Sequence, residues 1–372
     1  MYKMPLGRLK QIKINGYKSI RELDLELGPL NILIGPNGVG KSNFIGFFKF
    51  MKKILDKDLQ FYTSQQGGAN KLLHFGRKTT EKISFGLYFP PNAYACDLIS
   101  DTNDRLIFEK EIAFFRASDI GYYGGSKQAI LAKDGDVESK LPLHGGTSSI
   151  SSHIVRYIKD WKVYHFHDTS ASAKVKLTCN VNDCEILAQD GANLAAFLRN
   201  IREHNIRSYT EIIKTIQRVA PFFHDFILEP EINNQDTIKL KWKHKGTDEY
   251  FDANDLSDGT LRFICLTTLL LQPNLPTIIL LDEPELGLHP FALQLLASMF
   301  KKISKKTQII ASTQSVTLTD NFDIEDIIVV NRKENCSDLK RLKKEDYQEW
   351  LEEYSLGEIW QKNLIGGVPS YD

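Results

Sequence analysis

The sequence predicts an α/β fold in which helices pack on a parallel sheet, next to a lobe that is rich in strands. From residue 258 onward, a helix, a buried apolar strand at 277–282, a helix at 290–305 and another buried strand at 307–311 follow one another. This alternation is typical of parallel sheets covered by helices. The first 116 residues differ, because short runs in which apolar and polar residues alternate predict strands there.

The N-terminal elements can be predicted in order. Apolar and polar residues alternate at 9–16 and again at 22–27, so both segments are predicted strands. Gly28 and Pro29 predict a turn before a short buried strand at 30–34. A glycine-rich loop and an amphipathic helix at about 42–55 follow, and residues 81–116 contain further predicted strands.

The remaining segments suggest three parts. Residues 117–152 are rich in Gly and Ser and predict hairpins or a loose excursion, whereas 192–220 has helical spacing that ends at Pro221. Strand-like runs return at 223–252. We therefore expect an N-terminal lobe at 1–116, a partly helical insertion at 117–222 and a C-terminal lobe at 223–372.

The overall charge of the chain does not indicate a nucleic-acid partner. Lys and Arg together number 47, as do Asp and Glu, so a nucleic-acid contact would need a local patch. The five cysteines form no C-x-x-C pair, which favours free thiols in a reducing cytoplasm. The longest apolar stretch, near 263–271, is far too short to span a bilayer. We expect a cytoplasmic protein without a membrane partner.

A phosphate-binding loop is the strongest motif. Residues 35–42 read G-P-N-G-V-G-K-S, directly after the predicted strand at 30–34 and at the start of a predicted helix, which is the context this motif needs. Glycines let backbone N–H groups point at phosphate oxygens, and the helix N-terminus favours an anion. Lys41 is predicted to bind the β and γ phosphates of ATP, and Ser42 to bind Mg²⁺. The predicted nucleotide-binding residues of the loop are Asn37, Gly38, Gly40, Lys41, Ser42 and Asn43.

Two carboxylates end the buried strand I-I-L-L-D-E-P at 278–284. Asp282 is predicted to hold Mg²⁺ through water, and Glu283 is placed to act as the general base on the attacking water. An exposed acidic strand end is the alternative, which the phosphate-binding loop disfavours.

A third motif, L-S-D-G-T at 256–260, lies with its serine 25 residues before Asp282. It resembles the signature of ABC ATPases, although a helix N-cap alone would look similar. The resemblance implies that Ser257 and Gly259 contact the γ phosphate bound by another copy. Each nucleotide site would then be completed only in a homodimer or higher oligomer.

Further segments narrow the resemblance. The run E-P-E-L-G-L-H-P at 283–290 resembles the corresponding region of RecF-, SMC- and OLD-type ATPases, where transporter subunits usually differ. Segments at 14–20, 163–170, 255–263 and 354–360 look like standalone bacterial RecF-like ATPases. This resemblance implies an ABC ATPase head with a β-rich lobe, a parallel-sheet lobe and a helical insertion. Only about 60 residues follow the switch motif at 312–315, which leaves no room for the nuclease domain of OLD-type proteins.

Gln314 departs from the family pattern. The segment after the strand at 307–311 reads S-T-Q-S, where the related proteins usually have histidine in place of Gln314. A glutamine amide can hydrogen-bond a phosphate or a water, but it cannot act as a protonated switch. We therefore predict a catalytic role for Gln314 in slow, dimer-dependent hydrolysis; capping of the next turn is the alternative.

Several assignments stay open. Gln65, Gln66 and Gln128 are all candidates for the glutamine that family members place near the nucleotide, and residues 17–19 are the candidate adenine contact. His165 and His167 share a strand face and could bind a metal, although a structural strand end is favoured because no further ligands are evident. The lysines at 239, 241, 243 and 245 alternate with Trp242 and His244 and could follow a phosphate backbone; a solvated strand face is the alternative.

Two functions are consistent with these motifs. In the first, an ATPase switch couples its nucleotide state to DNA or to an effector such as a nuclease or toxin, in DNA repair or in defence against phage. In the second, ATP is a structural ligand of a scaffold or sensor that binds a toxin or nuclease with little turnover. A transporter subunit is disfavoured by the E-P-E-L-G-L-H-P segment.

Overall fold

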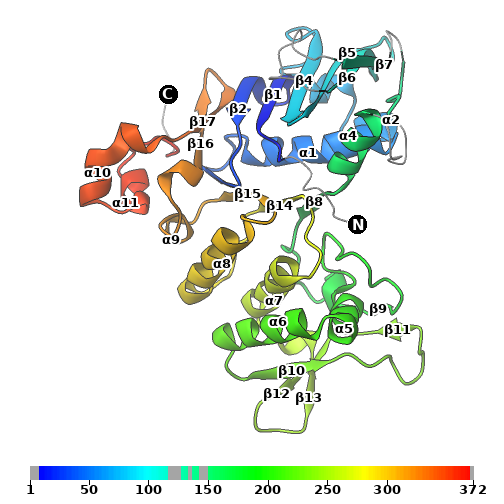
Figure 1. Cartoon of the computed structure of the whole chain (residues 1–372), viewed down its shortest axis with the longest axis vertical. Coiled ribbons are helices and arrows are strands. Elements are labelled where there is room, and N and C mark those ends of the chain that lie inside the picture. Colours follow the sequence, from blue (N-terminus) through cyan, green and yellow to red (C-terminus); the bar gives the residue numbers. More distant parts are fainter. Residues whose placement is uncertain (1–7, 116–126, 133–135, 142–149, 369–372) are drawn as a thin grey trace. The chain divides into compact units, whose positions relative to one another are not determined.

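The computed structural model describes residues 8–115, 127–132, 136–141 and 150–368 (Figure 1). The chain forms two compact units. The first contains residues 1–161, 277–280 and 308–372, and the second contains 162–276 and 281–307. The chain therefore leaves the first unit and re-enters it twice.

An antiparallel sheet with the strand order β2-β1-β4-β5-β6-β7 forms one part of the first unit. The alternating runs at the N-terminus are its first two strands, which pair so that Ile12 lies opposite Leu25. The predicted strands of this region are confirmed, and their bounds are β1 Gln11–Tyr17, β2 Ile20–Glu26, β4 Lys82–Phe89, β5 Asn92–Ser100, β6 Leu106–Phe115 and β7 Lys127–Ala132.

Helix α1 (Lys41–Leu55) packs its aromatic face on this sheet. The ring of Phe47 lies 5.4 Å from that of Tyr17 and 5.3 Å from that of Phe85, in edge-to-face contacts. The predicted helix at 42–55 is thereby confirmed, and its orientation is set by strands β1 and β4. Three more helices belong to this unit: α2 Leu59–Gln65, α3 Ala69–Leu72 and α4 Ile150–Lys159.

A second six-stranded sheet has the order β17-β16-β3-β15-β14-β8. Strand β3 (Leu30–Ile34) runs parallel to both β15 (Gln308–Thr313) and β16 (Ile327–Lys333), which confirms the parallel pairing expected for the apolar runs. All five residues of β3 are buried, which explains why it does not alternate. Strand β17 (Cys336–Arg341) is antiparallel to β16 because the chain reverses through Glu334 and Asn335, both with positive φ. The remaining strands are β14 Ile278–Asp282, which leaves the first unit after Leu280, and β8 Trp161–Tyr164.

Three short helices complete the first unit near the C-terminus: α9 Val316–Thr319, α10 Gln348–Glu353 and α11 Leu356–Gln361. The backbone N–H of Gly357 donates to Asp320 Oδ1 at 2.5 Å, and the Trp360 indole donates to the Gly367 carbonyl at 2.8 Å. The Y-S-L-G-E-I-W segment therefore begins α11 with a capping box formed by Ser355 and Glu358.

The second unit is mainly helical. The predicted helical segment 192–220 forms α5 (Leu194–His204) and α6 (Ile206–Val219), and the helix expected from 258 is α7 (Asp258–Leu271). Residues 261–271 of α7 are all buried, which accounts for the apolar run there. The unit also contains helix α8 Pro290–Ile303, the sheet β10 Phe223–Ile227, β12 Lys241–His244 and β13 Tyr250–Asp252, and the strand pair β9 Cys179–Asn180 and β11 Thr237–Ile238. Among the described residues, no helix combines the length and apolar character that a bilayer crossing needs.

Candidate nucleotide-binding site

The glycine-rich loop connects the buried strand β3 to helix α1, as the motif predicts. Gly38 and Gly40 have φ values of 79° and 110°, in the region that side-chain-bearing residues rarely adopt. A Cβ atom on Gly40 would come within 2.0 Å of the Ser337 hydroxyl oxygen, whereas one on Gly38 would meet no atom within 4 Å. Gly40 is therefore required both by its conformation and by its neighbours.

Lys41 folds back over the loop. Its ammonium group donates to the carbonyl of Gly35 at 2.6 Å and to that of Pro36 at 2.9 Å, and the side chain is buried. Asn37 and Ser42 are exposed at the same loop. A loop with an inward lysine, an exposed hydroxyl and backbone N–H groups at a helix start can hold a polyphosphate.

A cluster of hydroxyl groups supports the loop from behind, and sequence reasoning missed its most distant member. The hydroxyl of Ser337, on β17, donates to the Val39 carbonyl at 2.5 Å and lies 2.7 Å from the Ser19 hydroxyl. The Asn43 amide donates to the same Ser19 oxygen at 2.7 Å. Ser337 is buried and 298 residues from Val39, so no local signal could have revealed it.

Gln314 directly follows β15 at the same sheet edge as the loop. In the register of the parallel pair, Thr313 lies opposite Ile34, so Gln314 and Gly35 follow adjacent strands at the same level. Gln314 is partly buried. The backbone of Gln314 therefore lies next to the end of β3, where the phosphate-binding loop begins.

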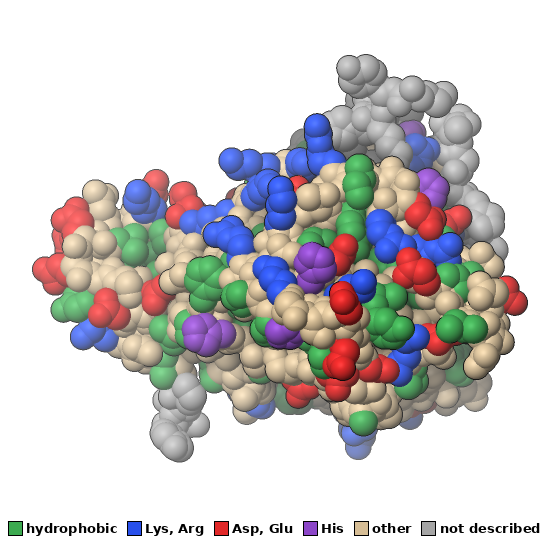
Figure 2. All heavy atoms as spheres, turned by 90° about the horizontal axis from the view of Figure 1, so that it is seen from below, with side chains coloured by type: hydrophobic (Ala, Val, Ile, Leu, Met, Phe, Trp, Pro, Cys, Tyr) green, Lys and Arg blue, Asp and Glu red, His purple; other side chains and the backbone are tan. Residues whose placement is uncertain are grey.

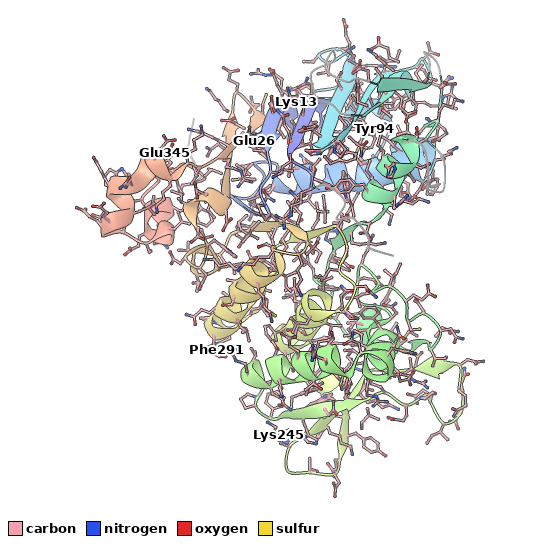
Figure 3. All side chains as sticks on the ribbon, in the orientation of Figure 1. Lys13, Glu26, Tyr94, Lys245, Phe291 and Glu345 are labelled. Carbon is pink, nitrogen blue, oxygen red and sulfur yellow. The ribbon has the colours of Figure 1, made fainter. Side chains whose placement is uncertain are left out.

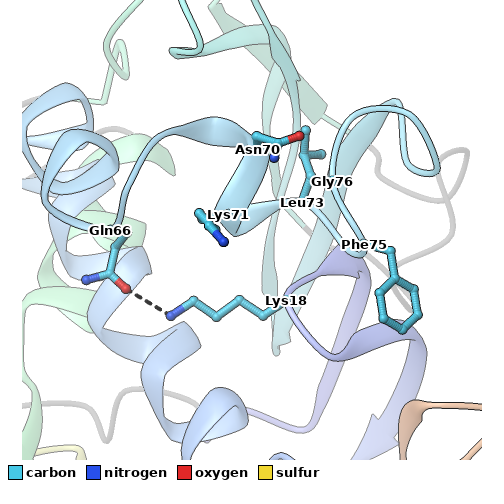
Figure 4. Close-up of a pocket in the computed structure, with 7 residues that line it drawn as sticks. All are labelled: Lys18, Gln66, Asn70, Lys71, Leu73, Phe75 and Gly76. Atoms are coloured by element: carbon cyan, nitrogen blue, oxygen red, sulfur yellow. Dashed lines mark hydrogen bonds between the residues drawn. The ribbon is translucent and has the colours of Figure 1, made fainter.

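A polar hollow lies beside the loop support (Figure 4). The Lys18 ammonium donates to Gln66 Oε1 at 3.0 Å, and the neighbouring Ser19 belongs to the cluster behind the loop. Burial, followed by the nearby Lys49 ammonium, lowers the pKa of Lys18. Of the three candidate glutamines, Gln66 contacts the predicted adenine segment; Gln65 ends α2, and Gln128 lies in β7, whose side chains are outside the described residues.

The signature segment starts helix α7 in the second unit. Ser257 is the N-cap, and its hydroxyl accepts from the backbone N–H of Thr260 at 3.2 Å. The Ser257 and Asp258 side chains are exposed. A Cβ on Gly259 would meet the Gly287 carbonyl oxygen at 2.2 Å. The signature therefore lies directly against the segment that follows the acidic strand end, and a side chain at Gly259 would separate them.

Arg262 joins these segments. It is buried in α7, and its guanidinium donates to the carbonyls of Phe166 at 2.9 Å, His167 at 3.0 Å and Leu286. Burial lowers its pKa. The sequence contains one indication of these contacts, which is an arginine near the start of an otherwise apolar helix. A buried guanidinium needs several hydrogen-bond acceptors, so such an arginine indicates contacts with other segments.

Asp282 ends β14, and Glu283 follows it in a left-handed conformation with φ 44°. Both side chains are partly buried. The Nε2 atom of His167 donates to the Asp282 carbonyl at 2.6 Å, which attaches residues 165–168 to the acidic strand end. Among the described residues, no group of three or more His, Cys, Asp or Glu side chains could hold a metal ion.

The last residues of the E-P-E-L-G-L-H-P segment form the start of helix α8. His289 is the N-cap of α8, its ring accepting from the Phe291 backbone at 3.3 Å, and Pro290 occupies the first turn. Leu286 and Phe291 are 41% and 45% exposed, and Figure 3 shows Phe291 at one end of α8. Both are exposed apolar side chains of the segment that follows the acidic strand end.

Two of the four alternating lysines at 239–245, in and around β12, form ion pairs. Trp242 is buried between Phe223 and Phe251, so the lysines lie on the other face as predicted. Lys241 pairs with Glu231 at 2.7 Å, and Lys239 pairs with Asp252. Figure 2 views the β12–β13 side and shows cationic, acidic and apolar side chains on the same face. This pattern favours a solvated strand face over a phosphate track.

Comparisons with known proteins agree with this description. Residues 30–320 match the model of the AAA_21 family, described as "AAA domain, putative AbiEii toxin, Type IV TA system". No curated protein matches the chain. The structure is similar to an SMC head bound to the C-terminal winged-helix domain of ScpA, with a TM-score of 0.54, 14% identity and coverage of 92% of this chain and 99% of that one. It is also similar to an SMC head with an extended coiled coil bound to the C-terminal domain of ScpA derived from Pyrococcus furiosus, with a TM-score of 0.54, 14% identity and coverage of 94% and 99%. The SMC head fold is thus present over most of the chain.

Proposed function

Because the chain belongs to the AAA_21 family and has the fold of an SMC head, we propose that it is an ATPase switch whose nucleotide sites are shared by two copies. ATP binds to the phosphate-binding loop through the backbone, Lys41 and Asn43. A second copy covers the nucleotide with Ser257 and the N-terminus of α7. ATP binding joins the two copies, and hydrolysis separates them.

One observation supports this proposal above the others. Ser257 and Asp258 are exposed at the N-terminus of α7, a 14-residue helix whose remaining surface is mostly buried. The N-terminus of a helix, with a serine hydroxyl beside it, favours an anion. Leu286, whose neighbour Gly287 lies against Gly259, and Phe291 at the start of α8 are exposed and supply apolar area for a partner copy.

The oxygen ligands fit Mg²⁺. Ser42 is an exposed hydroxyl at the loop, and Asp282 is a carboxylate that the family motif assigns to the metal. Mg²⁺ prefers such oxygen donors and retains several waters. When bound, it neutralises charge that develops on the phosphates. Glu283 accepts a proton from the attacking water, and Gln314 orients that water or the γ phosphate.

Mixing two inactive variants tests the shared site. Lys41→Ala removes the phosphate cation of a copy, and Ser257→Arg blocks its signature. Each variant alone should lose hydrolysis. In an equal mixture, half of the dimers pair the intact loop of one copy with the intact signature of the other. Because these hold one whole site out of two, about a quarter of the wild-type activity should return. No recovery in a mixture shown to contain mixed dimers would refute the shared site.

The nucleotide state of the switch controls a binding partner. We propose a protein effector, such as a toxin or nuclease, with DNA as a second candidate. The family description names a toxin system, and the similar SMC heads are bound to a domain of ScpA, which supports a protein partner for this head.

A scaffold with little turnover is the second candidate function, because Gln314 cannot carry a proton at the switch position. Single-turnover measurements separate the two. Cleavage of bound ATP within minutes in the dimer supports the switch, whereas ATP that remains intact through repeated partner binding supports the scaffold.

A further inference from the structure

We propose that a basic groove centred on Phe75 binds single-stranded nucleic acid, through stacking on the ring and phosphate contacts to Lys18, Lys71, Arg77 and Lys78. Two adjoining hollows of about 560 and 430 Å³ form this groove, and they share Asn70 and Phe75. All of these residues lie in the first unit. The inference builds on the proposed function, since it gives the switch a nucleic-acid ligand.

An exposed aromatic ring is held in place at the centre of the groove. Phe75 is 59% exposed and has a positive φ of 53°. The surrounding turn is well bonded, because the Gly76 N–H donates to the Leu73 carbonyl at 3.0 Å and the Thr80 hydroxyl donates to the His74 carbonyl at 2.6 Å. The buried His74 ring anchors the turn through the Lys18 carbonyl at 2.7 Å, and its centroid lies 4.3 Å from that of the Phe75 ring, with the two ring planes tilted by 53°. A turn that fixes a bulky apolar ring toward solvent favours a ligand for that ring.

Positive charge in the groove is poorly compensated. Four cationic residues line the two hollows, against the single carboxylate of Asp104. That carboxylate already accepts from the Asn70 backbone at 2.9 Å. Within the described part of the chain, Lys71, Arg77 and Lys78 have no ion-pair partner. In Figure 4, Lys18 and Lys71 extend into the same space.

The charge pattern favours a polyanion over the base of ATP. The triphosphate of ATP is assigned to the phosphate-binding loop, and adenine itself carries no charge to balance these cations. A chain of phosphates with unstacked bases satisfies both features, because successive phosphates meet the cations and one base stacks on the ring. Duplex DNA would leave Phe75 without a stacking partner, since its bases are already stacked.

Fluorescence anisotropy with a labelled oligothymidylate of about 16 nucleotides tests the proposal in the full chain. Measured with saturating non-hydrolysable ATP, Phe75→Ala should weaken binding about 5- to 100-fold, and Phe75→Tyr should retain it. Phe61→Ala is the matched control, because Phe61 is 60% exposed on α2 in the same unit but does not line the groove. Replacing Lys71, Arg77 and Lys78 together by Ala should lower the slope of log affinity against log salt by about 0.7 per cation. The exposed pair Lys243 and Lys245, replaced by Ala, should leave that slope unchanged.

Three results would overturn the inference: equal loss in the Phe61 and Phe75 variants, displacement of the oligonucleotide by ATP in direct competition, or equal affinity for a duplex of the same length. ATP binding is followed in parallel with a fluorescent analogue. If ATP binds and the oligonucleotide does not, the groove proposal fails alone. If ATP itself does not bind, the proposed function fails.

Discussion

The phosphate-binding loop and the signature segment are both glycine-containing helix starts, yet their surroundings are opposite. The helix end of the loop is enclosed, since Gly40 leaves no room for a methyl group beside Ser337 and Lys41 is buried. The start of the signature helix is open, because the Ser257 and Asp258 side chains are exposed, as is Leu286 in the segment that packs on Gly259. An enclosed segment has its contacts already, whereas an open one with anion-binding geometry has contacts still to make. This difference is the physical reason to expect that two copies complete one site.

The largest effect should come from Glu283→Gln. Removing the general base should slow hydrolysis about 100-fold or more, while the neutral amide leaves ATP binding intact. The dimer should then accumulate with ATP, as light scattering would reveal. Glu345→Gln, on the exposed segment before α10, serves as the control and should hydrolyse normally. A Glu283→Gln variant that turns over at the wild-type rate would remove the proposed base.

Gly40→Ala tests whether the helix end of the loop is enclosed. The methyl group would need the Ser337 hydroxyl to move, at a φ that alanine rarely adopts. We expect the free energy of unfolding to fall by about 2–4 kcal/mol, with loss of ATP binding. Gly38→Ala has the same backbone cost but open space, and should lose about 1 kcal/mol. Denaturant titration of both variants decides this, and equal losses would contradict an enclosed Gly40.

Gln314→Ala tests the neighbour of the loop at the sheet edge. Loss of one amide hydrogen bond to the γ phosphate or to the attacking water should slow hydrolysis about tenfold, with little change in ATP affinity. Gln314→Asn or Gln314→His should recover part of the rate if the side chain reaches the reacting groups. Hydrolysis at the wild-type rate in Gln314→Ala would leave the residue with a turn-capping role only.

The smallest change is expected from Phe291→Glu on the open side. Phe291 is partly exposed, so the free energy of unfolding should change by less than about 0.5 kcal/mol. The ATP-dependent dimer should nevertheless dissociate about tenfold more readily, because a charge would enter an apolar contact. Ile232→Glu, at a residue 92% exposed in the same unit, is the matched control. If sedimentation shows the two variants to dimerise alike, Phe291 does not lie in the interface.

Local patterns were sufficient for the elements that carry the motifs. The buried strand β3, the helix after the loop and the N-cap at Ser257 depend on residues within a few positions of one another, so hydrophobic periodicity, glycine and capping chemistry predict them. The same patterns predicted the lysine face of β12 but not its ion pairs, because Glu231 approaches from another loop.

The sequence by itself determined the motifs from which we predict the residues that hold a triphosphate and Mg²⁺, since those motifs depend on residue type and spacing. Only the tertiary structure decided three further sets of neighbours. The Ser337 hydroxyl contacts the Val39 carbonyl, Arg262 contacts three distant carbonyls, and Phe75 lines the groove together with four cationic residues. The first two sets of contacts join segments from 24 to 298 residues apart. Such contacts arise only when packing brings separate elements together, and the residues involved follow no short periodicity that a sequence pattern could display.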